Sequence, residues 1–183
     1  MALKATIFKA VVQIADMDRS YYHDHPLTIA RHPSETDERM MVRLLAFALH
    51  ANEALSFGRG LSSDDEPDIW EKDLTGSIRT WIDVGQPDER RIRKACGRAD
   101  RVFVYTYSST GRNVWWEQNE GSLERLDNLT VINLPTLATR ELAGLANRNM
   151  RLTCTVQENH VWLADERRSV SVEPETLKSN QIA

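Results

Sequence analysis

The sequence predicts an α/β (α+β) fold in which a mixed β-sheet is flanked by helices. Three observations support it: segments with apolar residues at every second position, segments with apolar residues three or four positions apart, and the alternation of both along the chain. With 183 residues, 41% of them hydrophobic, the chain is long enough to bury one sizeable core. We therefore expect a single domain over residues 1–183.

The N-terminal part predicts a β-hairpin followed by a buried helix. Alternating apolar residues indicate a strand over Leu3–Ile14, and a turn at residues 16–18 leads into a second strand near Leu27–Ala30. Ser34 is a candidate helix cap, and the run Met40–Leu49 behind it is apolar on nearly every side. We expect this helix to be largely buried.

The middle part predicts a strand, a tight turn and a helix. A polar, acidic loop covers residues 62–73 and has a short strand after it. The alternating segment Ile78–Val84 is a strand that carries Asp83 on its second face. Pro87 suits the first position of the next helix, whose apolar stripe runs from Ile92 to Ala99.

The C-terminal half predicts further strands and helices that end in a β-meander. Val102–Tyr107 is apolar on both faces, as expected for a central strand. The other predicted elements are a short segment around Trp115 and Trp116, a strand at 129–134, a helix at about 136–147, and strand pieces at 152–156, 161–163 and 170–172.

The charges separate sharply along the chain, although the net charge is only −4. Residues 64–73 contain six carboxylates and one lysine, whereas residues 87–101 contain six Lys or Arg and three carboxylates. The small acidic excess speaks against a protein that coats nucleic acid through bulk positive charge. A local cleft, with carboxylates beside a basic helix, remains compatible with nucleic acid as a partner.

The composition also excludes several classes of protein. No apolar run approaches the roughly 20 residues that span a bilayer, and Lys9 interrupts the segment where a secretory signal needs its apolar core. Cys96 and Cys154 lie among apolar neighbours, which favours buried, reduced thiols. We therefore expect a cytoplasmic protein with no membrane contact. No Walker loop or Gly-x-Gly-x-x-Gly motif is present, so we expect no nucleotide cofactor, and the oligomeric state is left open.

Asp68 and Asp83 are the candidate site residues. They are fifteen positions apart, a separation that lets two adjacent strands, joined by a turn at residues 73–77, bring them together at one sheet edge. Mg²⁺ takes hard oxygen ligands and needs only one or two protein carboxylates beside substrate phosphate. Cationic side chains on the following helix would face the phosphate oxygens. The pattern is that of a metal-dependent phosphodiesterase.

At these residues the sequence resembles the PD-(D/E)XK nuclease-like superfamily, in which Pro-Asp precedes one strand and (D/E)-x-K lies on the next. More closely, it resembles the YaeQ family of small bacterial proteins that has been placed in that superfamily. The likeness covers almost the whole chain, through residues 1–6, 31–36, 38–40, 64–67, 87–92, 94–95 and 115–116. It implies a restriction-endonuclease-like core with an N-terminal hairpin and a C-terminal β-meander.

The resemblance implies roles for particular residues. Asp68 matches the Asp of Pro-Asp and Asp83 matches the (D/E) position, so both would be metal ligands and catalytic residues. The motif lysine is missing, because Gly85 stands at its position. Lys94 is the candidate catalytic replacement, since helical side chains lean back toward the helix N-terminus.

Five further residues complete the predicted site. Arg90, Arg91 and Gln86 lie closer in sequence to the motif and are candidates for substrate binding. Glu35 or Glu38, on the first long helix, would supply an additional metal ligand, as a helix glutamate does in some members of the superfamily. The implied cofactor is Mg²⁺.

Two functions remain as hypotheses. The first is a Mg²⁺-dependent phosphodiesterase that acts on nucleic acid. The second is a catalytically inactive nucleic-acid-binding or protein-interaction module that kept the nuclease fold after losing the lysine. The basic helix also fits a simple exposed face paired with Asp88 and Glu89, and His23 and His25 fit surface histidines better than metal ligands, because no third ligand follows from their spacing.

Overall fold

The computed structural model describes residues 4–59, 63–107 and 113–181. The chain divides into two compact units, which we treat separately. Unit 1 comprises residues 1–49 and 137–174, and unit 2 comprises residues 50–136 and 175–183. The single domain expected from the sequence stays a prediction. No helix in the described ranges is long and apolar enough to cross a membrane.

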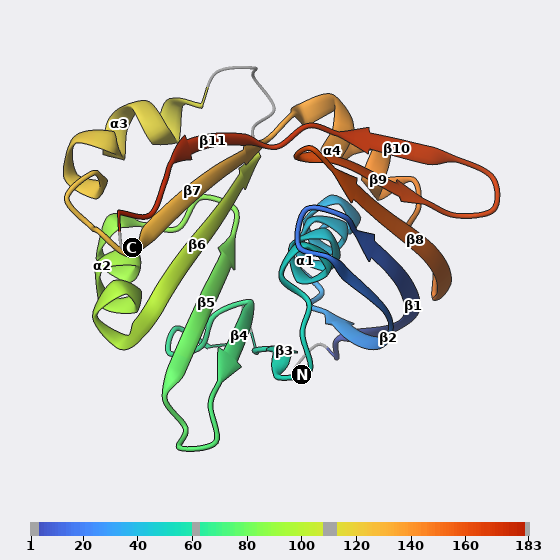
Figure 1. The fold of residues 1–183 in the computed structure, drawn as a ribbon, viewed down its shortest axis with the longest axis horizontal. Coiled ribbons are helices and arrows are strands. Elements are labelled where there is room, and N and C mark those ends of the chain that lie inside the picture. The colour runs from blue at the N-terminus through green and yellow to red at the C-terminus, as the bar shows by residue number, and fades with distance from the viewer. Residues whose placement is uncertain (1–3, 60–62, 108–112, 182–183) are drawn as a thin grey trace. The chain divides into compact units, whose positions relative to one another are not determined.

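Unit 1 is built on a five-stranded sheet in the order β10-β9-β8-β1-β2 (Figure 1). Its strands are β1 (Thr6–Asp16), β2 (Tyr21–Arg31), β8 (Asn149–Gln157), β9 (His160–Ala164) and β10 (Ser169–Val172). β1 pairs in parallel with β8, and the other neighbours are antiparallel. The alternation along β1 is strict: Phe8 and Val12 are buried, while Lys9 and Val11 on the opposite face are exposed. One face of this sheet therefore faces the core and the other remains open.

Two helices accompany this sheet, α1 (Asp37–His50) and α4 (Thr136–Ala143). Every residue of α1 from Met40 to Ala48 is buried, as the sequence predicted. Thr36, instead of the predicted Ser34, caps α1, because its hydroxyl oxygen accepts a hydrogen bond from the Arg39 amide. Ser34 instead hydrogen-bonds the His32 ring.

Unit 2 is built on a six-stranded sheet in the order β11-β7-β6-β5-β4-β3. Its strands are β3 (Leu55–Phe57), β4 (Ile69–Lys72), β5 (Ile78–Val84), β6 (Ala99–Tyr107), β7 (Leu129–Leu134) and β11 (Glu175–Lys178). β5, β6 and β7 are parallel, and the outer pairs are antiparallel. The mixed α+β class is thus confirmed, with two mixed sheets in place of the one that we expected.

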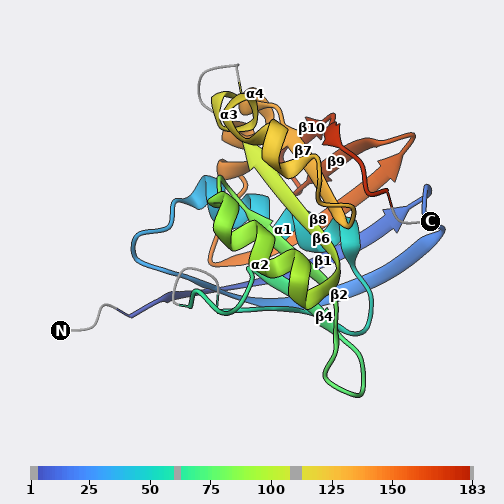
Figure 2. The same cartoon turned by 90° about the vertical axis from the view of Figure 1, so that its left-hand side faces the viewer.

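Helices α2 (Glu89–Arg98) and α3 (Val114–Leu123) pack on the unit 2 sheet, and Figure 2 shows α2 lying across β6. Ile92 and Ala95 of α2 share a buried cluster with Trp81, Trp115 and residues of β6 and β7. The N-cap of α2 is Asp88, whose carboxylate accepts the Arg91 amide hydrogen. Pro87 therefore precedes the cap and does not open the helix as predicted.

Several elements differ from the sequence-based expectation; for example, β4 lies inside residues 62–73, which were predicted as a loop. β2 begins at Tyr21, not near Leu27, because its polar first half pairs with the second half of β1. β11 was not predicted; Lys178 holds this edge strand by donating to the Leu126 and Leu129 carbonyls. The helix predicted at 136–147 ends at Ala143. The first strand was predicted to start at Leu3, which lies outside the described residues.

Candidate functional site

The pairing of β4 with β5 brings Asp68 and Asp83 together. Ile69 lies opposite Ile82 in this antiparallel pair, so Asp68 and Asp83 occupy the next facing positions. The Asp68 amide donates to Oδ1 of Asp83 at 3.4 Å. Oδ2 of Asp68 accepts the Val84 amide at 2.8 Å. Both aspartates are only 3% exposed, so their carboxylates need partners within the protein.

Arg91 supplies the main partner of Asp83. Its guanidinium binds the carboxylate in a two-pronged manner, with Nε 2.9 Å from Oδ2 and Nη2 3.0 Å from Oδ1. Trp81 Nε1 donates to Oδ2 at 3.0 Å, so the four N–H donors of Arg91, Trp81 and Asp68 engage both oxygens of Asp83. A carboxylate offers about four acceptor positions, and here they are filled.

The electrostatics of Arg91 reflect this position. Burial works against its charged form, but the hydrogen bond to Asp83 and the charges of Asp83, Asp68 and Asp64 outweigh burial and raise the pKa of Arg91. Arg91 therefore remains a permanent cation beside the aspartates. It provides the positive charge that the two buried carboxylates require.

Gly85, at the position where the sequence comparison expected a lysine, has a backbone conformation that suits glycine. Its φ is +105°, a left-handed conformation that glycine adopts readily and side-chain-bearing residues rarely do. The Gly85 amide donates to the Tyr105 carbonyl at 2.8 Å, which fixes the end of β5 in this conformation. A lysine at position 85 would strain the turn between β5 and α2.

The other predicted residues of the basic helix do not converge on the aspartates. Lys94, the candidate replacement lysine, forms an exposed ion pair with Asp65 at 2.7 Å. Arg90 and Gln86 are exposed. Of the cations that we predicted to act at this site, Arg91 is the one shown in contact with Asp83.

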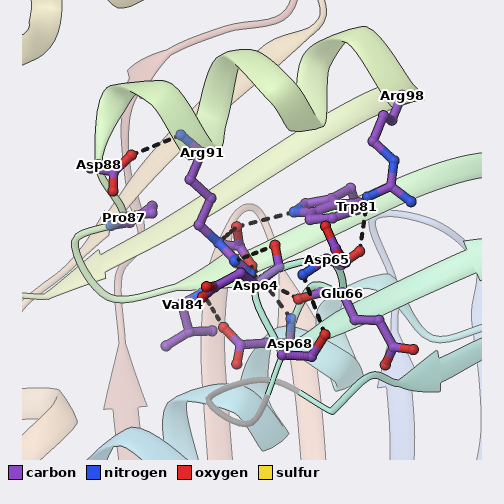
Figure 3. Close-up of polar contacts among 12 residues, drawn as sticks. Asp64, Asp65, Glu66, Asp68, Trp81, Val84, Pro87, Asp88, Arg91 and Arg98 are labelled. Carbon is purple, nitrogen blue, oxygen red and sulfur yellow. Dashed lines mark hydrogen bonds and ion pairs between the residues drawn. The ribbon is translucent and has the colours of Figure 1, made fainter.

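The acidic segment Asp64–Glu66 is held against α2. Arg91 donates to the carbonyls of Asp64 at 3.1 Å and Glu66 at 2.9 Å. Arg98 donates to the Asp65 carbonyl at 2.8 Å. Figure 3 shows these arginines reaching from α2 to the segment beneath it. Opposite charges in neighbouring stretches of sequence thus neutralise each other locally.

The two glutamates predicted as additional ligands belong to unit 1. Glu35 is 6% exposed and binds Arg43 through both carboxylate oxygens, while Arg39 donates to Oε1. Glu38 Oε2 accepts a long hydrogen bond from Thr139 at 3.5 Å. Glu35 is therefore engaged in a buried ion pair, and its role as a metal ligand stays a prediction.

As arranged, these residues do not fit a Mg²⁺ site. Within residues 4–59, 63–107 and 113–181, no group of three or more His, Cys, Asp or Glu side chains is placed to hold a metal ion. A divalent cation at Asp83 would have to displace at least one of the donors that fill its carboxylate, foremost Arg91. The guanidinium of Arg91 occupies the position beside Asp83 that a bound metal ion would need.

The comparisons with known proteins agree over nearly the full length. The profile of the family described as YaeQ protein matches residues 1–174. The chain belongs to the YaeQ family. It is 46% identical over 172 residues to the uncharacterised protein YaeQ of Escherichia coli (strain K12), covering 94% of this chain and 95% of that one. The corresponding protein of Salmonella typhi is 46% identical over 173 residues, covering 94% and 96%.

Solved structures of YaeQ proteins share the fold. The crystal structure of YaeQ from Xanthomonas axonopodis pv. citri matches with a TM-score of 0.92 and 48% identity, over 96% of this chain and 99% of that one. The structure from Pseudomonas syringae gives a TM-score of 0.91 and 37% identity, over 97% and 98%. The mixed α+β architecture is therefore that of the YaeQ family.

An aromatic and cationic row, which the sequence did not assign to the site, lies beside the YaeQ aspartates. Trp70 packs edge-on against Trp81 at 6.3 Å between ring centres. Lys72 lies 3.7 Å over the Trp70 ring, and Arg98 lies 5.2 Å over the Trp81 ring. The period-2 alternation of β4 and β5 places Trp70 opposite Trp81, so strand register was the signal that could have found this row.

His23 and His25 lie on the β1–β2 hairpin of unit 1, His23 exposed as predicted, and they form a small aromatic cluster with Tyr21. His25 Nε2 and the Tyr21 hydroxyl are 2.6 Å apart, and the His23 ring lies 5.0 Å from the His25 ring. Burial, together with the neighbouring His23 and Arg19, lowers the pKa of His25. Within the described part of the chain no third metal ligand joins them.

Proposed function

We propose that this YaeQ chain is a non-catalytic nucleic-acid-binding module that retains a nuclease-like fold. One observation carries the proposal: Arg91 holds Asp83 where a nuclease of this design would hold a metal ion. The paired positions of Asp68, before β4, and Asp83, near the end of β5, support a PD-(D/E)XK-like ancestry. The turn conformation at Gly85 supports the loss of the motif lysine.

The exposed side of α2 is the proposed binding surface. Lys94 and Arg93 form ion pairs with Asp65 and Glu89, but these pairs are largely open to water. Exposed ion pairs contribute little to stability, so a phosphate group can replace the carboxylate. Arg90 and Arg98 add two further exposed cations on the same helix.

The row of Trp70 and Lys72 supports a single-stranded partner. Trp70 is partly exposed and has Lys72 over its ring; an unpaired base that displaces Lys72 would stack on the ring while the lysine binds a phosphate. Bases in a duplex are stacked on each other and do not offer their faces. We therefore propose single-stranded nucleic acid over duplex DNA.

Fluorescence anisotropy with a labelled oligonucleotide tests this proposal. Lys94→Gln with Arg98→Gln should weaken binding several-fold and reduce the slope of log affinity against log salt by about 1.4, since each phosphate contact on a single strand contributes about 0.7. Arg101→Gln with Arg125→Gln, exposed in the same unit, removes the same charge outside α2 and is the matched control. No binding at low salt, or equal losses in both double variants, would overturn the proposal.

A Mg²⁺-dependent phosphodiesterase is the second candidate, favoured by the close approach of Asp68 and Asp83. In this candidate Asp68 and Asp83 would hold the ion in place of Arg91, and the ion would supply an activated water. Calorimetric titration of Mg²⁺ or Mn²⁺, beside a cleavage assay on DNA and RNA, separates the two candidates. Metal-dependent cleavage that Asp68→Asn and Asp83→Asn abolish would establish the enzyme and refute the non-catalytic module.

A further inference from the structure

Unit 1 contains a cavity of about 980 Å³ that is separate from the aspartate site. Its floor is the open face of the unit 1 sheet, where β1, β2 and β8 run side by side. Its walls are residues 144–147, which connect α4 to β8, and the turn 165–168 between β9 and β10. All of the lining residues belong to unit 1. This volume is typical of sites for small molecules.

The cavity is positively charged. Lys9, Arg151, Arg167 and Arg168 line it, against the carboxylates of Asp165 and Glu166, so its balance is 4 − 2 = +2 in a chain of net charge −4. Among the described residues, none of the four cations forms an ion pair with a carboxylate. Asp165 attracts Arg167 and Arg168 without forming an ion pair with either, and the positive excess that remains favours an anionic ligand.

The turn that carries two of these arginines is preorganised. Oδ1 of Asp165 accepts the amide hydrogens of Arg167 and Arg168, both at 2.8 Å, and the Asp165 amide donates to the Arg168 carbonyl at 3.0 Å. These backbone hydrogen bonds lower the pKa of Asp165, so its carboxylate stays ionised and engaged with the turn. The backbone of the turn is therefore held in place, and both arginines start from fixed positions at the cavity wall.

Gly144 makes room for Arg168 in the opposite wall. A Cβ at this position would collide with Nη1 of Arg168, so the guanidinium lies directly against the glycine backbone. The absence of a side chain at residue 144 thus sets where this arginine can lie. Gly144 connects the two walls of the cavity.

One strip of the otherwise polar floor is apolar. Val11 of β1 lies between Pro26 on β2 and Arg151 on β8 in the strand register. Val11 is 41% exposed, which is unusual for valine and leaves a nonpolar strip beside the charged groups. A ligand that fits has anionic groups that reach the cations and a less polar portion that lies on the strip of Val11 and Pro26.

We propose that this cavity binds a small molecule that carries two or more phosphate groups, of which a nucleoside triphosphate is the simplest type. Arginine and lysine side chains would bind the phosphates, since the chain has no glycine-rich phosphate loop. The Val11 and Pro26 strip would contact the base or sugar. The proposal is independent of α2 and of the nucleic-acid-binding function proposed above.

Isothermal titration calorimetry of the whole protein with ATP, and separately with pyrophosphate, tests the proposal. We expect binding of both, tighter for ATP, and a loss of about tenfold or more in ATP affinity for Arg151→Gln and for Arg168→Gln, because each removes a charge-assisted hydrogen bond. Arg140→Gln, exposed on α4 and outside the cavity, is the charge-matched control and should bind like the wild type.

Gly144→Ala provides a test without any change of charge. The added methyl group displaces a flexible side-chain end, so the protein should fold normally and still lose ATP affinity. No heat from either probe at millimolar concentration would overturn the proposal. ATP binding that survives all three cavity variants, or that is lost in Lys94→Gln with Arg98→Gln instead, would also overturn it.

Discussion

Two basic regions of this molecule use their cations in opposite ways. On α2, Arg91, Arg93 and Lys94 each form an ion pair with a carboxylate of the same unit. Around the unit 1 cavity, Lys9, Arg151, Arg167 and Arg168 form none within the described residues. The first region uses positive charge to neutralise buried or adjacent acids, whereas the second leaves it available. A count of charges in the sequence cannot distinguish the two.

The pairs on α2 also differ among themselves. Arg91 and Asp83 are 23% and 4% exposed at their side chains, whereas Lys94 and Asp65 are 56% and 77% exposed. Breaking a buried pair leaves an unpaired charge out of water, while breaking an exposed pair leaves two solvated charges. The variants below therefore probe positions from the most buried charge to the most available one.

The substitution Arg91→Met should cause the largest change in the free energy of unfolding. This substitution preserves much of the side-chain volume but leaves Asp83 ionised and buried, and it also removes the bonds to the Asp64 and Glu66 carbonyls. We expect a loss of about 3 kcal/mol in the free energy of unfolding. For a chain of this size that lowers the melting temperature by roughly 6–12 °C. Urea denaturation followed by circular dichroism measures it.

Asp83→Asn in the Arg91→Met background is the matched control. It removes the buried negative charge while keeping an oxygen that can accept from Trp81 Nε1. We expect the double variant to regain about half of the lost stability, because both ionic partners are then absent. A single variant as stable as the wild type would show that Arg91 does not neutralise Asp83 in solution.

The second expected effect is a pH-dependent loss of stability at the two cysteine thiols, one in each unit. Burial, with a smaller contribution from Asp16, raises the pKa of Cys154 on β8 from 9.0 to about 12. Burial also raises the pKa of Cys96 on α2, to about 11. A raised pKa keeps the thiol protonated in the folded state. The resulting contribution to the free energy of unfolding is fully present below pH 9, and it is lost as the pH rises from there toward the folded pKa.

At pH 10 we expect Cys154 alone to account for a stability loss of about 1.4 kcal/mol relative to pH 7.5. The loss for Cys96 is smaller, since its thiol is only partly buried. Comparing urea unfolding of the wild type, Cys154→Ala and Cys96→Ala at both pH values isolates each thiol from the other groups that titrate. An equal pH response in all three proteins would contradict the burial of the Cys154 thiol.

The sequence predicts much of the aspartate site but not its chemistry. Asp68 and Asp83 could be placed together because strand periodicity and a short turn fix their pairing. Arg91 was grouped with Arg90 as a substrate ligand, because each helical position rotates a side chain by about 100° and the sequence does not give the helix orientation. The positive φ of Gly85 could not be predicted from the sequence, and it gives glycine a structural role at this position.

The unit 1 cavity was not predicted at all. Its cations come from β1, β8 and the β9–β10 turn, so Lys9 is far in sequence from Arg151 and Arg168. They become neighbours only through the parallel pairing of β1 with β8, a long-range contact that periodicity alone does not specify. The α+β class and the buried helix α1, by contrast, follow from local patterns.

The third effect concerns Asp65, whose pKa is lowered by its hydrogen bond with Lys94 and by the charge of that lysine. Asp65→Asn should leave the free energy of unfolding unchanged, because the pair is exposed. It should raise the affinity for single-stranded nucleic acid a few-fold by freeing Lys94. Glu120→Gln, exposed on α3, controls for the change in net charge in the anisotropy assay. An equal gain in both variants would assign the effect to net charge alone.

A small expected change in stability at the unit 1 cavity separates the two regions most directly. Arg151→Gln and Arg168→Gln remove cations that have no ionic partner, so the free energy of unfolding should change by no more than about 0.5 kcal/mol. For Arg151→Gln the change should be a gain, since one of four like charges in the cavity is gone, and the gain should shrink in high salt, which screens that repulsion. For Arg168→Gln the lost attraction to Asp165 offsets that gain. Urea unfolding at low and high salt measures both quantities. A loss of stability comparable to that of Arg91→Met would mean that these arginines serve the fold, and the contrast between the two regions would then fail.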